Sequence, residues 1–152
     1  MDRKIVHSNV TVGENGHLYF AGADTVSLAE KYGTPVFLLD DARVRARIRE
    51  YKEAMQSNFG ENSVPLFASK SLSFKEIYRI MAEEGIGTDI VSSGELFTAV
   101  SAGFPMERAF FHGNNKTDFD IEYGIFRVVV HLGAGNGRTV ANGIMGNIPI
   151  WR

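Results

Sequence analysis

The chain has 152 residues, enough for one ordinary domain with a hydrophobic core. It is 44% hydrophobic and 22% charged, as globular proteins are, and its formal net charge of -2 gives no field to attract nucleic acid or an anionic membrane. No apolar run approaches the roughly 20 residues of a membrane span, no signal-peptide core follows the start, and cysteine is absent. We therefore expect a cytoplasmic protein with no nucleic-acid or membrane partner, no disulfide and no metal site.

A small β segment with one short helix is expected at the N-terminus, over residues 1–35. The Asn15-Gly16 pair lies between two short apolar runs, and it favours a hairpin because both residues tolerate positive φ angles. A helix over residues 27–32 should follow and should end at Gly33.

A strand and a long amphipathic helix are expected next. Residues 36–39 (VFLL) form an apolar run that predicts a strand, and Asp40 or Asp41 then caps the helix. Charged residues of both signs make up the wet face of this helix, which argues against a nucleic-acid patch. The apolar stripe has helical spacing and consists of Val44, Ile48, Tyr51 and Met55.

From residue 64 onward the chain repeats a strand–helix unit. Three apolar runs predict the strands, over residues 64–68, 87–91 and 109–112. Ser73 and Ser92 each begin a Ser-x-x-Glu capping box, Thr117 caps a third helix, and the first helix stops at Gly85. Successive units of this kind imply parallel strands with right-handed crossovers. The fold class is therefore α/β, either a doubly wound sheet or part of a (β/α)8 barrel.

Parallel strands bring their carboxyl ends to one edge of the sheet, where α/β folds place their chemistry. Lys70 follows the first strand, Asp89 lies on the second, and the third leads into His112 and Asn114. A partly desolvated lysine in such a place can form a Schiff base with a carbonyl group. Taken singly, these residues also fit a solvated loop lysine, a capping aspartate and a packing histidine. Their convergence on one edge is what predicts a site.

Several motifs resemble those of diaminopimelate decarboxylases. FASKS at residues 67–71 resembles the pyridoxal-phosphate lysine motif of that family, usually Y-A-x-K-A. GTDIVSSGEL at residues 87–96 resembles the family segment G-x-D-x-V-S-x-G-E-L. Three further motifs match in order and spacing: YGTP (residues 32–35), AGFP (residues 102–105) and FHGNNK (residues 111–116).

The resemblance implies a fold-type III enzyme with an alanine-racemase-like (β/α)8 TIM barrel and a separate β domain. Residues 36–125 would hold the first three to four units of the barrel. Lys70 would form the Schiff-base link to pyridoxal 5'-phosphate, whose ring is an electron sink for a carbanion. Asp89, His112 and Asn114 would line the cofactor. The implied reaction is decarboxylation of meso-2,6-diaminopimelate to L-lysine, and complete relatives are expected to be homodimers.

Alternatives remain within and outside this family. Ornithine or arginine decarboxylases, alanine racemases and single-barrel pyridoxal-phosphate carrier proteins share the fold type. The segments VSSGEL at residues 91–96 and HGNNK at residues 112–116 favour the diaminopimelate branch. A non-catalytic truncated homologue, or an unrelated α/β domain in which Lys70 is only a surface residue, are the alternatives from other classes.

The last segment, residues 126–152, shows no family pattern. A fourth strand is expected at residues 127–132, but the chain then turns glycine-rich, and neither an acidic residue nor a lysine follows Glu122. The run GAGNGR departs from a dinucleotide fingerprint, because Arg138 stands where glycine is needed. A complete barrel takes about 250 residues. We therefore expect a truncated product with a frameshifted or misjoined tail, and little activity from this chain alone.

Overall fold

The computed structural model describes residues 7–113, 115–126 and 131–132. The chain divides into two compact units, Met1–Val44 and Arg45–Arg152, and each is described by itself. Asn114, and all of the predicted tail segment except residues 126, 131 and 132, lie outside the described residues. Within the described ranges, no helix is both long and apolar enough to cross a membrane.

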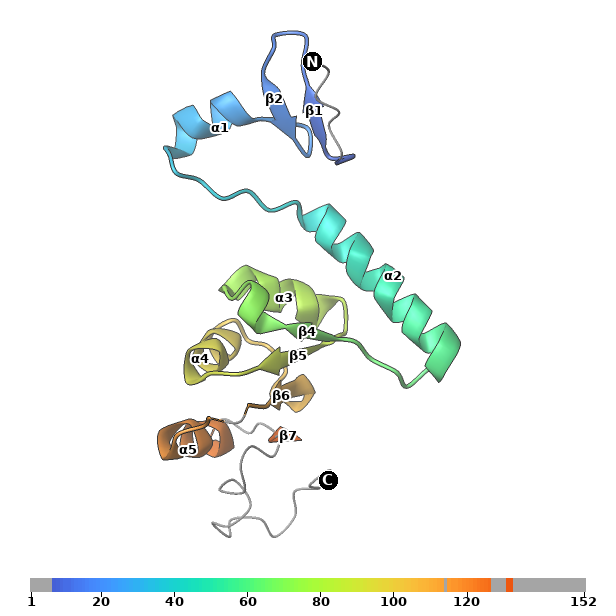
Figure 1. The fold of residues 1–152 in the computed structure, drawn as a ribbon, viewed down its shortest axis with the longest axis vertical. Helices are drawn as coiled ribbons and strands as arrows, with labels where there is room; N and C mark the ends of the chain where they lie inside the picture. The colour runs from blue at the N-terminus through green and yellow to red at the C-terminus, as the bar shows by residue number, and fades with distance from the viewer. Residues whose placement is uncertain (1–6, 114, 127–130, 133–152) are drawn as a thin grey trace. The chain divides into compact units, whose positions relative to one another are not determined.

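The first unit contains an antiparallel sheet and a short helix (Figure 1). The sheet has the order β1 (Val10–Val12), β2 (Leu18–Phe20) and β3 (Ala23–Asp24). The predicted hairpin is confirmed: Val12 pairs with Leu18, and Gly16 has a φ of 78°. Helix α1 (Thr25–Tyr32) ends at Gly33 as predicted, and the backbone N–H of this glycine donates to Ala29.

The strand predicted at residues 36–39 is wrong, because this segment is not part of any sheet. A strand is stabilised by hydrogen bonds to a neighbouring strand, and no described residue pairs with this segment in a ladder. The side chain of Phe37 is 99% exposed, so the apolar run is not buried either. The composition of the run was the only signal for a strand, and composition does not supply a partner.

Helix α2 (Asp41–Phe59) is capped by Asp40, whose carboxylate accepts a 3.0 Å hydrogen bond from the backbone N–H of Arg43. Ile48 is buried as expected, but Tyr51 is 67% exposed and does not belong to the buried stripe. Lys52 is half-buried in its place, one position further along. Its ammonium donates to the carbonyl oxygen of Glu84 at 3.1 Å, so a cation rather than an aromatic ring completes this face.

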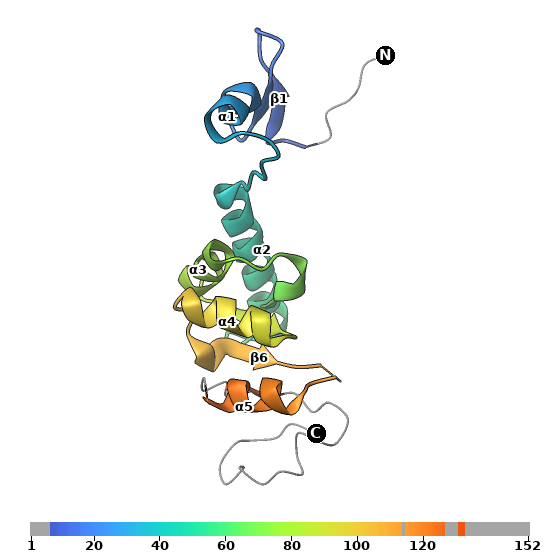
Figure 2. The ribbon, with the colours of Figure 1, turned by 90° about the vertical axis from the view of Figure 1, so that its left-hand side faces the viewer.

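The second unit is built on a parallel sheet (Figures 1 and 2). The strands lie in the order β4 (Leu66–Ala68), β5 (Gly87–Ile90), β6 (Ala109–Phe111) and β7 (His131–Leu132). Every neighbouring pair is parallel, which confirms the α/β prediction, and β7 lies inside the range predicted for a fourth strand.

Three helices connect these strands: α3 (Lys75–Glu83), α4 (Ser93–Ser101) and α5 (Asp118–Phe126). Neighbouring helices contact one another in chain order, and α3 packs on β5. The core between helices and sheet consists of apolar side chains from both, among them Ile77, Tyr78, Ile80, Met81, Ile90, Leu96 and Phe111. Burial of these side chains is the main stabilising contribution to this unit.

Of the three caps predicted for α3, α4 and α5, two are confirmed, although the Glu95 carboxylate bonds to Val91 and does not complete the capping box at Ser92. The hydroxyl of Ser92 accepts a 3.3 Å hydrogen bond from the N–H of Glu95 at the start of α4. At the start of α5, Thr117 accepts from the N–H of Asp120 at 3.2 Å, while the Asp120 carboxylate accepts from the N–H of Thr117 at 2.9 Å. These reciprocal bonds satisfy backbone donors that a helix start leaves unpaired.

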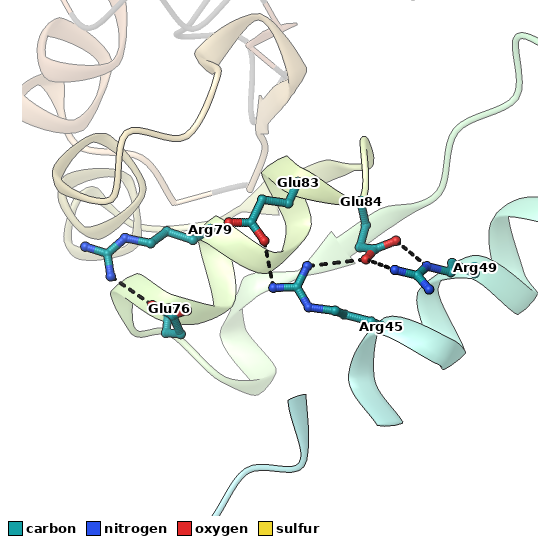
Figure 3. Close-up of polar contacts among 6 residues, drawn as sticks. All are labelled: Arg45, Arg49, Glu76, Arg79, Glu83 and Glu84. Atoms are coloured by element: carbon teal, nitrogen blue, oxygen red, sulfur yellow. Dashed lines mark hydrogen bonds and ion pairs between the residues drawn. The ribbon is translucent and has the colours of Figure 1, made fainter. Parts of the chain in front are cut away.

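The capping box predicted at Ser73 is wrong. Helix α3 begins at Lys75 with Phe74 as the residue before it, and no side chain caps this end. The hydroxyl of Ser73 instead lies 3.1 Å from that of Tyr78, a fully buried side chain whose polar end needs a partner. Glu76 pairs with Arg79 at 2.8 Å on the surface of the helix (Figure 3).

An ion-pair cluster joins α2 to the carboxyl end of α3 (Figure 3). Arg49 donates two hydrogen bonds of 2.7 Å to the carboxylate of Glu84. Arg45 bridges Glu83 at 2.7 Å and Glu84 at 3.3 Å. We call these four residues the Glu84 cluster. Two arginines predicted to lie on a wet helix face therefore hold α2 against α3.

Candidate functional site

The sheet register brings the carboxyl ends of β4, β5 and β6 to one edge. Ala68 lies opposite Asp89 on the neighbouring strand, and Asp89 lies opposite Phe110. Lys70 and His112 follow directly after β4 and β6. The structure therefore brings Lys70, Asp89 and His112 together at the edge where the parallel arrangement predicts them, whereas Asn114 lies outside the described residues.

Lys70 lies in the middle of a single 3-10 turn, Ser69–Ser71, which follows β4 without a gap. The hydroxyl of Ser71 donates to the carbonyl of Ala68 at 2.8 Å, and the N–H of Leu72 donates to Ser69 at 3.1 Å, which closes the turn. The side chain of Lys70 is exposed, and no described residue forms a hydrogen bond or ion pair with its ammonium group. The amine is thus available to a ligand.

Asp89 and His112 form a close pair at the ends of β5 and β6. The Nδ1 atom of His112 contacts a carboxylate oxygen of Asp89, and the backbone N–H of His112 donates to Ile90 at 3.0 Å. The two side chains are 22% and 55% exposed, respectively. A histidine held by a carboxylate at one ring nitrogen presents the other nitrogen to a ligand.

Lys116 brings a second amine to this edge. In the sequence it is the last residue of the motif FHGNNK and is not singled out as a site residue. Its ammonium donates to the carbonyl of Gly113 at 2.8 Å and lies 5.2 Å from the centre of the Phe111 ring. Burial lowers the pKa of Lys116, and the carboxylates of Asp120 and Asp89 partly oppose this. The half-buried position, which is what lowers the pKa, follows from tertiary packing and has no local sequence signal.

Asp120 connects this edge to the start of α4. Burial acts to raise the pKa of Asp120, but hydrogen bonds from Thr117 and Ser93 outweigh it, and the net shift is downward. Asp120 is therefore a carboxylate at neutral pH, and its charge contributes to the field around Lys116.

Sequence reasoning missed two further residues, Ser69 and Glu95. Ser69 is fully buried, and its hydroxyl oxygen lies 2.8 Å from the carbonyl oxygen of Asp89 and 2.7 Å from a carboxylate oxygen of Glu95. The sequence shows Glu95 as part of a capping box and of the segment GTDIVSSGEL, and the position before Lys70 is the variable one of the lysine motif. Only the fold shows that they touch.

A cavity of about 360 Å³ lies at the other end of the strands and does not belong to this site. Its lining includes Leu66 and Gly87, the first residues of β4 and β5, together with Arg108 just before β6. These positions are at the amino ends of the strands, whereas Lys70 follows a carboxyl end. In parallel α/β folds the chemistry lies at the carboxyl ends.

A family model described as pyridoxal-dependent decarboxylase, pyridoxal binding domain, matches residues 42–142. The diaminopimelate decarboxylase of Bacillus methanolicus is 41% identical over 119 residues, which are 78% of this chain and 27% of that protein. The diaminopimelate decarboxylase of Bacillus subtilis (strain 168) is 45% identical over 112 residues, 74% of this chain and 25% of that protein. The chain thus spans about a quarter of the length of these relatives.

Solved structures show the same likeness. The diaminopimelate decarboxylase from M. jannaschii in complex with L-lysine superposes with a TM-score of 0.71 and 28% identity, covering 84% of this chain and 30% of that one. A lysine/ornithine decarboxylase from Vibrio vulnificus, complexed with putrescine, has a TM-score of 0.66 and 25% identity, covering 76% of this chain and 30% of that one.

Proposed function

Because this chain belongs to the pyridoxal-dependent decarboxylase family, whose pyridoxal binding domain matches residues 42–142, we propose that Lys70 holds pyridoxal 5'-phosphate covalently. We further propose that the domain serves the decarboxylation of meso-2,6-diaminopimelate to L-lysine. The observation that supports this most is the placement of Lys70 at the same sheet edge as the pair of Asp89 and His112.

The residues at this edge fit the cofactor. An aldehyde needs an amine that it can reach, and Lys70 is exposed with no polar partner among the described residues. A polar heteroaromatic ring needs hydrogen-bonding groups around it, and Asp89 and His112 supply a carboxylate and an imidazole. Asn114 remains a proposed member of the same set.

The topology supports a partial (β/α)8 barrel over residues 36–125. The strand order from β4 to β7 follows the chain without a reversal. In a doubly wound sheet the strand order reverses at a switch point, whereas in a barrel each new strand lies next to the preceding one, always in the same direction around the barrel. We also propose that residues 1–35 belong to the separate β domain of the family and that residues 126–152 lie outside its pattern. Homodimeric assembly and a cytoplasmic location stay predictions.

When bound, the cofactor supplies an electron sink for the pair of electrons released as the carbon–carboxylate bond of the substrate breaks. Carbon dioxide leaves, and a proton takes the place of the carboxylate on the carbon. Lys70 would hold the cofactor, and its amine would be placed to carry a proton at this edge. Asp89 orients the imidazole of His112 through its Nδ1 atom.

The choice of diaminopimelate rests on the relatives. The curated proteins quoted above are diaminopimelate decarboxylases at 41% and 45% identity. The rival substrate class is a shorter diamino acid such as ornithine, which the likeness to the Vibrio vulnificus lysine/ornithine decarboxylase favours at 25% identity. The higher sequence identity to the diaminopimelate decarboxylases supports diaminopimelate as the substrate.

The first experiment asks whether Lys70 binds the cofactor. The purified chain is mixed with pyridoxal 5'-phosphate, its absorbance is recorded, the link is fixed with borohydride, and the labelled peptide is identified by mass spectrometry. We expect a band near the visible edge and a label on Lys70. Lys70→Ala should lose both, and Lys75→Ala, which removes an exposed lysine at the start of α3, should keep both. Equal labelling of all three proteins would contradict the proposal.

The same label separates the substrate classes without requiring turnover. A substrate amine that displaces Lys70 protects it from borohydride labelling. We expect meso-diaminopimelate to reduce the labelled fraction of Lys70 more than ornithine or arginine at the same concentration. Stronger protection by ornithine would support the rival substrate, and equal protection by all amines would contradict a diaminopimelate site.

A further inference from the structure

A buried hydrogen-bond network lies directly behind Lys70. The hydroxyl of Ser69 is fully buried, 2.7 Å from the Oε2 atom of Glu95 and 2.8 Å from the carbonyl oxygen of Asp89. The same Oε2 atom accepts a 2.8 Å hydrogen bond from the backbone N–H of Val91. The network therefore joins the turn after β4, the end of β5 and the first turn of α4.

The distances and burial make this network costly to break. A hydroxyl has one proton, so Ser69 donates either to Glu95 or to the carbonyl of Asp89. Bonds to a carboxylate are among the stronger hydrogen bonds in proteins, and a buried polar group that loses its partner carries its full desolvation penalty. Removing Ser69 takes from Glu95 its bond to the turn after β4, and removing Glu95 takes an acceptor from both Ser69 and the N–H of Val91.

Helix capping does not explain the position of Glu95. In a capping box the glutamate accepts from the backbone N–H of the capping serine, which here is Ser92. The Glu95 carboxylate instead reaches one residue further, to Val91, and across to Ser69 in the turn after β4. Ser92 already satisfies the N–H of Glu95 itself.

We propose that Ser69 and Glu95 are positioning residues that set the backbone of Lys70 relative to Asp89. Ser69 is the neighbour of Lys70 in the turn, and its hydroxyl contacts the main chain of Asp89 itself. The network thus links the attachment point of the proposed cofactor amine to the strand end that carries the carboxylate. This inference rests on the proposed function, although one of its tests needs no cofactor.

The variants are chosen to separate positioning from general stability. Ser69→Ala removes the link from the turn after β4, and Glu95→Ala removes the bonds to both Ser69 and Val91. Glu95→Gln keeps an oxygen that can accept from both. Ser71→Ala is the matched control, because Ser71 also flanks Lys70, and among the described residues its hydroxyl bonds to Ala68 at the end of β4. Thermal unfolding of each full chain shows whether it folds.

Two readouts are compared. We expect Ser69→Ala and Glu95→Ala to bind pyridoxal 5'-phosphate at Lys70 about tenfold more weakly, the size of one lost charge-assisted hydrogen bond. Glu95→Gln should restore binding to within about twofold of the parent chain, and Ser71→Ala should match it. In hydrogen exchange without cofactor, the amide of Val91 should exchange about tenfold faster in Glu95→Ala only, because Ser69→Ala keeps the Glu95 acceptor.

The outcomes are decisive in either direction. If Ser69→Ala binds the cofactor as well as Ser71→Ala does, or if Glu95→Gln is as weak as Glu95→Ala, the inference is overturned. If the parent chain itself takes no label at Lys70, the proposed function fails, and Val91 exchange then decides the network by itself. Should Ser69→Ala not fold, the comparison of Glu95→Gln with Glu95→Ala carries the test.

Discussion

Two lysines at the sheet edge differ in their surroundings. A lysine that forms a Schiff base is usually helped by partial desolvation. Lys70 is exposed, and the described residues supply no apolar cover for it. Lys116 is the half-buried amine, whose pKa is lowered by burial. Toward the described residues, the side chain of Lys70 is therefore open to a ligand.

The lowered pKa of Lys116 predicts a pH-dependent stability. The unfolded chain keeps the proton of this lysine up to about its ordinary pKa of 10.5, whereas the folded chain releases it at lower pH. Between these two values the unfolded state binds more protons, so folding becomes more favourable as pH rises. We expect the free energy of unfolding of the parent chain, relative to Lys116→Met, to increase from neutral pH towards 10.5.

Urea unfolding at a series of pH values measures this difference, and other titrating groups cancel in the comparison. The carboxylates of Asp120 and Asp89 oppose the lowering of the Lys116 pKa, and both are kept in every variant compared. Lys75→Met is the control, since Lys75 is exposed. A relative stability that stays flat or falls with rising pH would refute the assignment.

At the scale of elements, the Glu84 cluster holds α2 on the end of α3 (Figure 3). The side chain of Glu84 is only 9% exposed, whereas Arg49 is 62% exposed. We expect Glu84→Gln to lower the free energy of unfolding by about 1 kcal/mol, because solvent around the arginines screens part of the interaction. Glu76→Gln removes an exposed pair with Arg79 on the same helix and should cost less than about 0.5 kcal/mol.

The Glu84 cluster also predicts how the free energy of unfolding changes on acidification. Hydrogen bonds from Arg49 and Arg45, the stronger effect being that of Arg49, hold the pKa of Glu84 below its ordinary 4.5. The stabilisation is therefore complete above pH 4.5 and is lost as pH falls through the lower folded value. The free energies of unfolding of the parent chain and of Glu84→Gln, measured by chemical unfolding, should become equal on acidification. If Glu84→Gln and Glu76→Gln lower the free energy of unfolding equally at neutral pH, the stabilising role of the cluster is contradicted.

For the whole molecule, burial is distributed unevenly. No described residue of the first unit is buried, whereas the buried side chains all belong to the second. Local stability follows the density of buried apolar contacts. We expect amide hydrogen exchange, measured by peptide mass spectrometry, to be fast in β1 and β2 and slowest in β5, α3 and α4. Equal protection of the hairpin and β5 would contradict this expectation, and exposed peptides of α2 serve as an internal reference.

Local signals predicted the local features. The Asn15-Gly16 hairpin, the end of α1 at Gly33 and the caps at Ser92 and Thr117 each depend on residues within a few positions of one another. Where the partner is distant in the sequence, prediction failed. Ser73 bonds to the buried Tyr78 and does not cap a helix. Lys52 takes the half-buried position expected for Tyr51, because its ammonium donates to the carbonyl of Glu84 directly after α3.

The sequence by itself determined the parallel α/β class, the placement of Lys70, Asp89 and His112 at strand ends, and the family to which the chain belongs. These follow from periodicity and motifs, which are written in short stretches of chain. The tertiary structure alone decided that residues 36–39 form no strand and that Ser69 and Glu95 meet behind Lys70. Pairing and burial depend on what packs opposite a residue, and no local pattern specifies that partner.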